Sequence, residues 1–133
     1  MINRDPVAMA DFIIKFSPKS GGMVMDMLSH DYDLARWFAG SDARSDYGLG
    51  GTFVYDGLKA VGDIDNCSFL VEFKNGVIGQ LEISRNSAYG YHVETEIYGS
   101  KGNIRIGMLP LRDRVTYMNE TSISVNTADW FYE

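Results

Sequence analysis

The sequence predicts an α+β domain: a large, mostly antiparallel sheet with one face covered by a helix. Three observations lead to this prediction. One long amphipathic segment has the spacing of a helix, several short apolar segments are typical of strands, and short turns rich in glycine and asparagine separate the strands. No repeat, low-complexity segment or linker interrupts the 133 residues, so we expect a single domain, 1–133.

The predicted helix covers residues 24–38. It follows Ser20-Gly21-Gly22, where the chain can turn into a helix, and it ends before Gly40, a typical helix stop. At 100° per residue, six apolar side chains form one arc: Val24, Met27, Leu28, Leu34, Ala35 and Phe38. Asp31 falls inside this arc, which helix curvature or a buried ion pair would explain.

The remaining segments are predicted as strands. They are residues 10–16, 51–55, 67–73, 77–84, 93–98, 103–106, 114–118 and 122–125. Asn75-Gly76 is a strong hairpin signal, and residues 99–102 and 119–120 predict two further hairpins. Consecutive hairpins predict an antiparallel meander. Because one helix covers only one face, the other face would meet solvent, another domain or another subunit, and we expect a homo-oligomer formed through the sheet.

Composition limits the partners. The net charge of -6 disfavours nucleic acid, whose phosphates are neutralised by Lys and Arg. Cys67 is the only cysteine, which excludes an internal disulfide and a cysteine-based zinc site and favours a reducing compartment. No apolar run approaches the roughly 20 residues that span a bilayer, and the first six residues lack the apolar core of a signal peptide. We therefore expect a cytoplasmic protein that binds neither nucleic acid nor membrane.

Asp26, His30 and Asp33 are the residues that could carry chemistry. Their spacing of four and three places them on one stripe of the predicted helix. A carboxylate one turn from an imidazole can hold one ring nitrogen, which leaves the other to take a proton, as the oxidation of an alcohol requires. Two alternatives stay open: an ordinary exposed Asp/His pair, and a metal site, although no second histidine lies nearby.

Three blocks of sequence carry a family resemblance. Residues 21–37 follow the pattern G-G-x-x-x-D-x-x-x-H-D-x-D-x-A-R, and residues 73–86 and 89–102 supply the two blocks that follow it. Arg4-Asp5-Pro6 provides a further marker, a turn after the first strand. Together and in this order, the chain resembles the substrate-binding, C-terminal domain of inositol 2-dehydrogenase-like oxidoreductases, the Gfo/Idh/MocA family.

The resemblance implies roles for single residues. His30 would be the general base and Asp26 its orienting partner, completed in the family by a lysine from another domain. Asp33 would contact a substrate hydroxyl, and Asn3, Asp5 and Tyr89 would line the substrate site. For Tyr89, a position in the core or in an interface remains the alternative.

The resemblance also implies an NAD- or NADP-dependent parent enzyme that acts on a small polyol or sugar, with inositol as the best single guess. The lysine motif E-K-P of the nucleotide-binding domain does not occur in the sequence, and neither does a G-x-G-x-x-G between a strand and a helix. Residues 48–51 are the only comparable glycine cluster, and we expect them in a loop before a strand. We therefore expect a domain truncated relative to the family, without its nucleotide-binding domain, inactive alone and binding no cofactor itself. The alternative for the isolated chain is a non-catalytic oligomerisation module formed by the exposed sheet.

Overall fold

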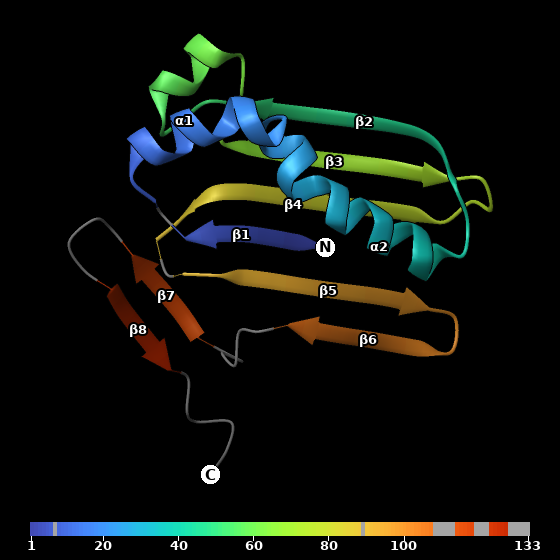
Figure 1. Ribbon diagram of the computed structural model, residues 1–133. Helices are drawn as coiled ribbons and strands as arrows, with labels where there is room; N and C mark the ends of the chain where they lie inside the picture. The colour runs from blue at the N-terminus through green and yellow to red at the C-terminus, as the bar shows by residue number, and fades with distance from the viewer. Residues whose placement is uncertain (7, 89, 108–113, 119–122, 128–133) are drawn as a thin grey trace.

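One layer of the molecule is a six-stranded sheet, and the helices lie on one of its faces (Figure 1). The computed structural model describes residues 1–6, 8–88, 90–107, 114–118 and 123–127. The strand order of the sheet is β2-β3-β4-β1-β5-β6, and β7 and β8 form a separate two-stranded sheet. This arrangement confirms the predicted α+β class with one covered face.

The elements have the following bounds. The sheet contains β1 (Ile2–Pro6), β2 (Ala43–Gly51), β3 (Asn66–Phe73), β4 (Ile78–Ser87), β5 (His92–Gly99) and β6 (Gly102–Gly107). The second sheet pairs β7 (Arg114–Met118) with β8 (Ile123–Thr127) in antiparallel register. The helices are α1 (Ala10–Ser20), the π-helix η1 (Val24–Leu28), α2 (Ser29–Ala39) and the 3₁₀-helix η2 (Asp56–Val61).

The predicted meander is wrong at the centre of the sheet. All three predicted hairpins form, but β1 lies between β4 and β5, parallel to β4 and antiparallel to β5. Ile2 pairs with Glu82 on one side and with Glu94 on the other. These pairings are long-range, so no local turn signal could reveal them. Arg4, Asp5 and Pro6 belong to the end of β1 itself rather than to a turn after it.

Residues 10–16 form a helix and not the predicted strand. They lie in α1, which buries Ile13 and Ser17, four residues apart, against η2. A short apolar run fits a strand and a buried helix equally well, and its length was the misleading cue. The helix ends at Gly21, which adopts the left-handed conformation with φ 82° and donates its N–H to the Ser17 carbonyl.

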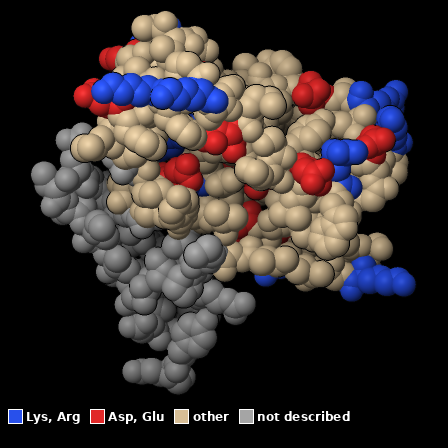
Figure 2. Space-filling model, viewed as in Figure 1, with Lys and Arg blue, Asp and Glu red and all other residues tan. Residues whose placement is uncertain are grey.

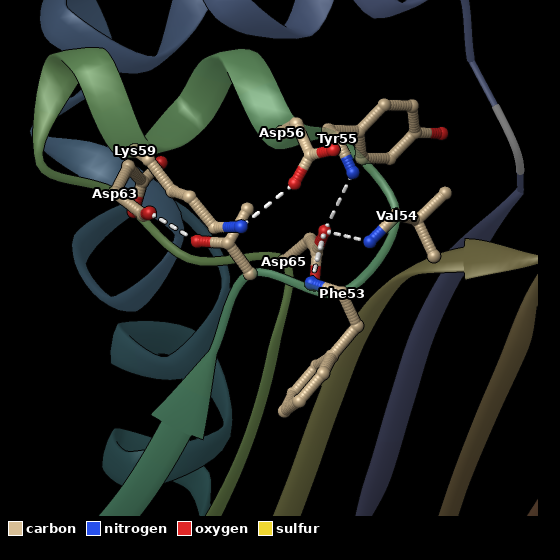
Figure 3. A network of polar contacts seen from close by, with 8 residues as sticks. Phe53, Val54, Tyr55, Asp56, Lys59, Asp63 and Asp65 are labelled. Atoms are coloured by element: carbon tan, nitrogen blue, oxygen red, sulfur yellow. Dashed lines mark hydrogen bonds and ion pairs between the residues drawn. The ribbon is translucent and has the colours of Figure 1, made fainter.

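The predicted strand 51–55 is also wrong beyond its first residue. Strand β2 ends at Gly51, and the loop that follows turns its backbone toward the fully buried Asp65 (Figure 3). The carboxylate accepts N–H groups from Phe53, Val54 and Tyr55 at 2.7–3.1 Å. Burial alone would raise the pKa of Asp65, but these donors more than offset it and hold the pKa below its usual value. The buried charge therefore fixes a loop where the apolar residues suggested a strand.

The main core lies between the helices and the centre of the sheet. The helical side contributes Met23, Met27 and Leu28, and the strands contribute Cys67, Val71, Phe73, Leu81 and Ile83. On β3 and β4 these side chains alternate, so the residues between them point to the opposite face. That opposite face carries exposed apolar side chains from four strands: Tyr47, Leu49, Leu70, Ile78 and Tyr98.

Candidate functional site

The predicted catalytic helix is not a uniform α-helix. The π-helix η1 carries Asp26, and α2 continues from Ser29 with His30 and Asp33. The Ser29 N–H bonds to the Val24 carbonyl, five residues back, as a π-helix requires. Such single π turns occur frequently at functional sites.

The double glycine before η1 sets the path of the chain. Gly22 has φ 84°, and a Cβ placed there would come 2.9 Å from Oδ1 of Asp63. The Asp63 carboxylate accepts the Met23 N–H at 3.0 Å and the Ser17 hydroxyl at 2.6 Å. Asp63 therefore ties the end of α1 to the start of η1, and this fixes where Asp26 leaves the backbone.

Asp26 pairs with an arginine and not with His30. Its Oδ2 accepts a hydrogen bond from Nη2 of Arg85 at 2.6 Å, whereas no hydrogen bond joins Asp26 to His30 among the described residues. His30 is exposed on α2. The wider π turn directs Asp26 toward β4, so the four-residue spacing did not bring the carboxylate to the imidazole.

Arg85 was not singled out from the sequence, although it is the most buried charged group near Asp26. It is 3% exposed at the C-terminal end of β4, and its Cζ lies 5.9 Å from the ring centroid of Phe16. Asp5 of β1 interacts electrostatically with both Arg85 and Asp26. Burial raises the pKa of Asp5, Arg85 lowers it in part, and Asp26 raises it further. Asp5, Asp26 and Arg85 therefore form one cluster, which we call the acidic clamp.

Asn3 is held by the buried helix carboxylate. Its Nδ2 donates to Oδ2 of Asp31 at 2.7 Å, and Asp31 is 5% exposed. Burial raises the pKa of Asp31, while the Asn3 hydrogen bond lowers it in part. Of the two explanations left open for Asp31, no ion pair with another side chain is found in the described part of the chain, and an amide hydrogen bond takes its place.

His30 and Asp33 lie in a shallow hollow on the outer side of α2. Trp37 and Asp42 also line it. The Arg36 guanidinium forms ion pairs with both carboxylates, at 3.4 Å from Oδ1 of Asp33 and 2.5 Å from Oδ1 of Asp42. Figure 2 shows Asp and Glu side chains emerging in the middle of the helix-covered face, with most Lys and Arg side chains nearer its margins. Tyr89, the remaining predicted substrate residue, lies outside the described residues.

The described residues offer no metal site and no dinucleotide cradle. No group of three potential metal ligands is found among them, and none of their helices is long and apolar enough to cross a membrane. The glycine cluster 48–51 lies inside β2, where a Cβ at Gly48 would come 2.5 Å from the Phe69 ring, and not in the predicted loop. The loop N–H groups that follow bind Asp65, so they are not free to hold a phosphate. Neither the glycine cluster nor this loop therefore presents free N–H groups in a turn that could hold a phosphate.

Comparison with known proteins gives consistent matches. A family model for the GFO/IDH/MocA C-terminal domain matches residues 3–105. The scyllo-inositol 2-dehydrogenase (NAD(+)) of Bacillus subtilis is 37% identical over 95 residues, which cover 71% of this chain and 28% of that protein. The myo-inositol 2-dehydrogenase of Thermotoga maritima is 36% identical over 85 residues, 64% of this chain and 25% of that protein.

Solved structures agree with these matches. The scyllo-inositol dehydrogenase of Lactobacillus casei with bound cofactor NAD(H) and scyllo-inositol aligns with a TM-score of 0.73 at 37% identity, over 95% of this chain and 38% of that chain. The myo-inositol 2-dehydrogenase of Lactobacillus plantarum aligns with a TM-score of 0.75 at 34% identity, over 95% and 38%. The chain spans a quarter to a third of the length of the curated relatives that it matches.

Proposed function

The chain belongs to the GFO/IDH/MocA family, to whose C-terminal domain it corresponds, and from this premise we propose that it forms the substrate side of an inositol-type polyol dehydrogenase. The observation that carries the proposal is the acidic clamp, whose Asp26 precedes His30 by four residues on the same helical path. Asp26 reaches Arg85 of β4, and His30 opens to the surface one turn further along. Carboxylates and an imidazole suit a ligand rich in hydroxyl groups.

His30 is the proposed general base. Its imidazole is exposed, so a substrate hydroxyl can donate a hydrogen bond to a ring nitrogen and pass its proton to it. Asp26 does not orient this imidazole directly, because its Oδ2 is engaged by Arg85. We assign Asp26 instead to a substrate hydroxyl, through the oxygen that Arg85 leaves open.

Asp5, Asp33 and Asn3 have smaller proposed roles. The two carboxylates can each accept a hydroxyl hydrogen bond of the ring, since Asp5 lies in the acidic clamp and Asp33 is exposed beside His30. Asn3 already donates to Asp31, so only its amide oxygen is left for a ligand. Tyr89 stays a prediction.

The cofactor of the proposed reaction is NAD or NADP, bound outside the residues described. In the Lactobacillus casei relative the bound molecules are NAD(H) and scyllo-inositol. For this chain alone we expect no saturable binding of NADH at micromolar concentration, which a fluorescence titration measures. Saturable binding would contradict the proposed division of the site between this chain and a separate cofactor-binding part.

Ligand binding tests the proposal directly. Isotope-labelled chain is titrated with scyllo-inositol and myo-inositol and followed by NMR. We expect saturable shifts at the amides of Asp5, Asp26 and His30, and none at the exposed ion pair Arg44–Glu72 of β2 and β3. If neither inositol causes saturable shifts, the proposed substrate class is rejected.

Activity tests the role of His30. The chain is joined to the part of the Bacillus subtilis relative that it does not match, and NAD reduction is measured with scyllo-inositol. We expect His30→Ala to lower kcat roughly 100- to 10,000-fold, the usual contribution of a general base. Asp56→Asn, a change in an exposed ion pair on η2, serves as the control. Normal turnover of His30→Ala would exclude His30 as the base.

A second function is favoured by the opposite face of the sheet. Exposed apolar side chains lie there among polar ones, which suits a homo-oligomer: Tyr47, Leu49, Leu70, Ile78 and Tyr98. Light scattering of the chain at micromolar concentration would detect it. Leu70→Asp should then shift the chain toward the monomer, whereas Met9→Asp, a change at a more exposed apolar residue outside the sheet, should not. A monomeric wild-type chain would rule out this function.

A further inference from the structure

The guanidinium of Arg85 is buried at the end of β4, where three elements meet. Its Nη2 donates to Asp26 of η1, and its Cζ lies over the ring of Phe16 of α1. The charge of Arg85 also lowers the pKa of Asp5 of β1 in part. Burying a cation costs free energy unless carboxylates and polarisable groups compensate its charge. Asp26, Asp5 and Phe16 are the groups that compensate Arg85 here.

The hydrogen bonding at both partners is incomplete. The Nε of Arg85 is buried and has no partner within the described part of the chain. Asp26 uses only Oδ2 for Arg85, and Oδ1 accepts no hydrogen bond from the described residues. One donor and one acceptor of the acidic clamp therefore remain without a partner among the described residues.

We propose, on the basis of the proposed function, that Arg85 is a positioning residue of the polyol site. It holds the Asp26 carboxylate in one orientation through Oδ2, so that Oδ1 remains to accept a hydrogen bond from a substrate hydroxyl. Phe16 closes one side of the guanidinium plane and limits its motion. Asp5 supplies the second negative charge that compensates the buried cation.

The planar fork of arginine suits this role better than lysine. A guanidinium presents several donors in a fixed plane, whereas an ammonium is a compact point charge on a flexible stem. Arg85→Lys keeps the charge and loses the fork. Arg85→Gln keeps a polar donor and loses the charge. The two variants therefore separate charge compensation from orientation.

Two measurements test the proposal. The first is the affinity for scyllo-inositol, which we expect to fall at least about tenfold in Arg85→Gln and by a smaller factor in Arg85→Lys. The second is the titration of the Asp5 carboxyl by carbon NMR. Because Arg85 lowers the pKa of Asp5 in the native chain, Arg85→Gln should raise this pKa further. The Asp5 pKa reports the charge of Arg85 and not its fork, so Arg85→Lys should leave this pKa near its native value while it still lowers the affinity.

Arg44→Gln is the matched control. Arg44 also forms an ion pair with a carboxylate, Glu72, but the pair joins β2 and β3, at the edge of the sheet away from β1. We expect inositol affinity and the Asp5 titration to stay at native values in this variant. If Arg85→Gln does not fold, two other measurements test the positioning role. One is the inositol affinity of Arg85→Lys. The other is the nitrogen resonances of the native Arg85 side chain, which should shift on addition of scyllo-inositol.

The outcomes separate the two proposals. If the native chain binds no inositol, the proposed function fails, and the Asp5 titration in the Arg85 variants still decides whether Arg85 organises the acidic clamp. If folded Arg85→Gln and Arg85→Lys both bind inositol with native affinity, Arg85 is not a positioning residue. A loss of affinity in Arg85→Lys, in which Asp5 titrates as in the native chain, supports the positioning role.

Discussion

Gly22 lies directly against the carboxylate of Asp63: a Cβ at this glycine would come 2.9 Å from Oδ1. We expect Gly22→Ala to lower the free energy of unfolding, because alanine would meet this oxygen and would also adopt a left-handed φ of 84°. Gly40→Ala is the control, since Gly40 has φ 61° but no atom within 4 Å of the added Cβ.

The difference between the two variants isolates the contact with Asp63. Strain alone costs about 1–2 kcal/mol and should account for Gly40→Ala. Gly22→Ala should cost at least about 1 kcal/mol more, as overpacking does. Urea unfolding measures both, and equal losses would show that the close approach of Asp63 has no energetic effect.

Asp65 should be the most costly of the loop carboxylates to remove, because it is fully buried. Asp65→Ala leaves the N–H groups of Phe53, Val54 and Tyr55 without their acceptor, and we expect a loss of at least about 3 kcal/mol. Asp56→Ala removes an exposed partner of Lys59 and should cost less than about 0.5 kcal/mol. Denaturant unfolding compares the two, and similar small losses would contradict a structural role for the buried carboxylate.

The Asp65 contribution should also depend on pH. Its folded-state pKa lies below the ordinary value, so the stabilisation is present above about pH 4, the unfolded pKa, and is lost as the pH falls through the folded pKa. The stability difference between the native chain and Asp65→Ala should therefore shrink in acid. A difference that stays constant down to the folded pKa would refute this assignment.

Asp31 should behave in the opposite way. Burial raises its folded-state pKa, so its ionised form opposes folding at neutral pH and the penalty disappears as the pH falls below the unfolded value. Asp31→Asn keeps an acceptor for Asn3 and should stabilise the chain at pH 7 but not near pH 3. Thermal unfolding at both values decides this, and a variant less stable at neutral pH would show that the charge itself is needed.

The charge of the site predicts its choice among inositols. Asp5, Asp26 and Asp33 are acidic, and the guanidinium of Arg85 is already engaged. A phosphorylated inositol should therefore bind at least about tenfold more weakly than scyllo-inositol, because like charges repel at short range. Calorimetry with both ligands checks this, and tighter binding of the phosphate would mean that Arg85 is open to anions.

Local signals predicted local structure well. Asn75-Gly76 places the turn between β3 and β4 correctly. Of the predicted apolar arc, Met27 and Leu28 pack in the core, whereas Leu34 and Phe38 are exposed. The position of β1 depends on pairing with residues about 80 positions away, which no local pattern encodes. The strand predicted at 10–16 failed for a related reason, since only burial against η2 distinguishes that helix from a strand.

The candidate site was predicted in part. The spacing and the family resemblance selected Asp26 and His30, but the partner of Asp26 was missed. Arg85 lies within one of the family blocks, next to Ser84 and Asn86. It continues the alternation of the buried Leu81 and Ile83, and a charged residue on that core-facing side of the strand was the signal that could have marked it. Its pairing with Asp26 follows only from the tertiary packing of β4 against η1.

The π turn at Val24–Leu28 has a consequence for how this helix can change. Each residue of an α-helix advances the chain by about 100°, so one residue more or less within η1 resets the rotational phase of everything before it. A deletion there would convert the turn to ordinary α-helix and rotate Asp26 away from Arg85 while α2 stayed in place. Because of this π turn, the side chains of Asp26 and His30 point in different directions although they are four residues apart.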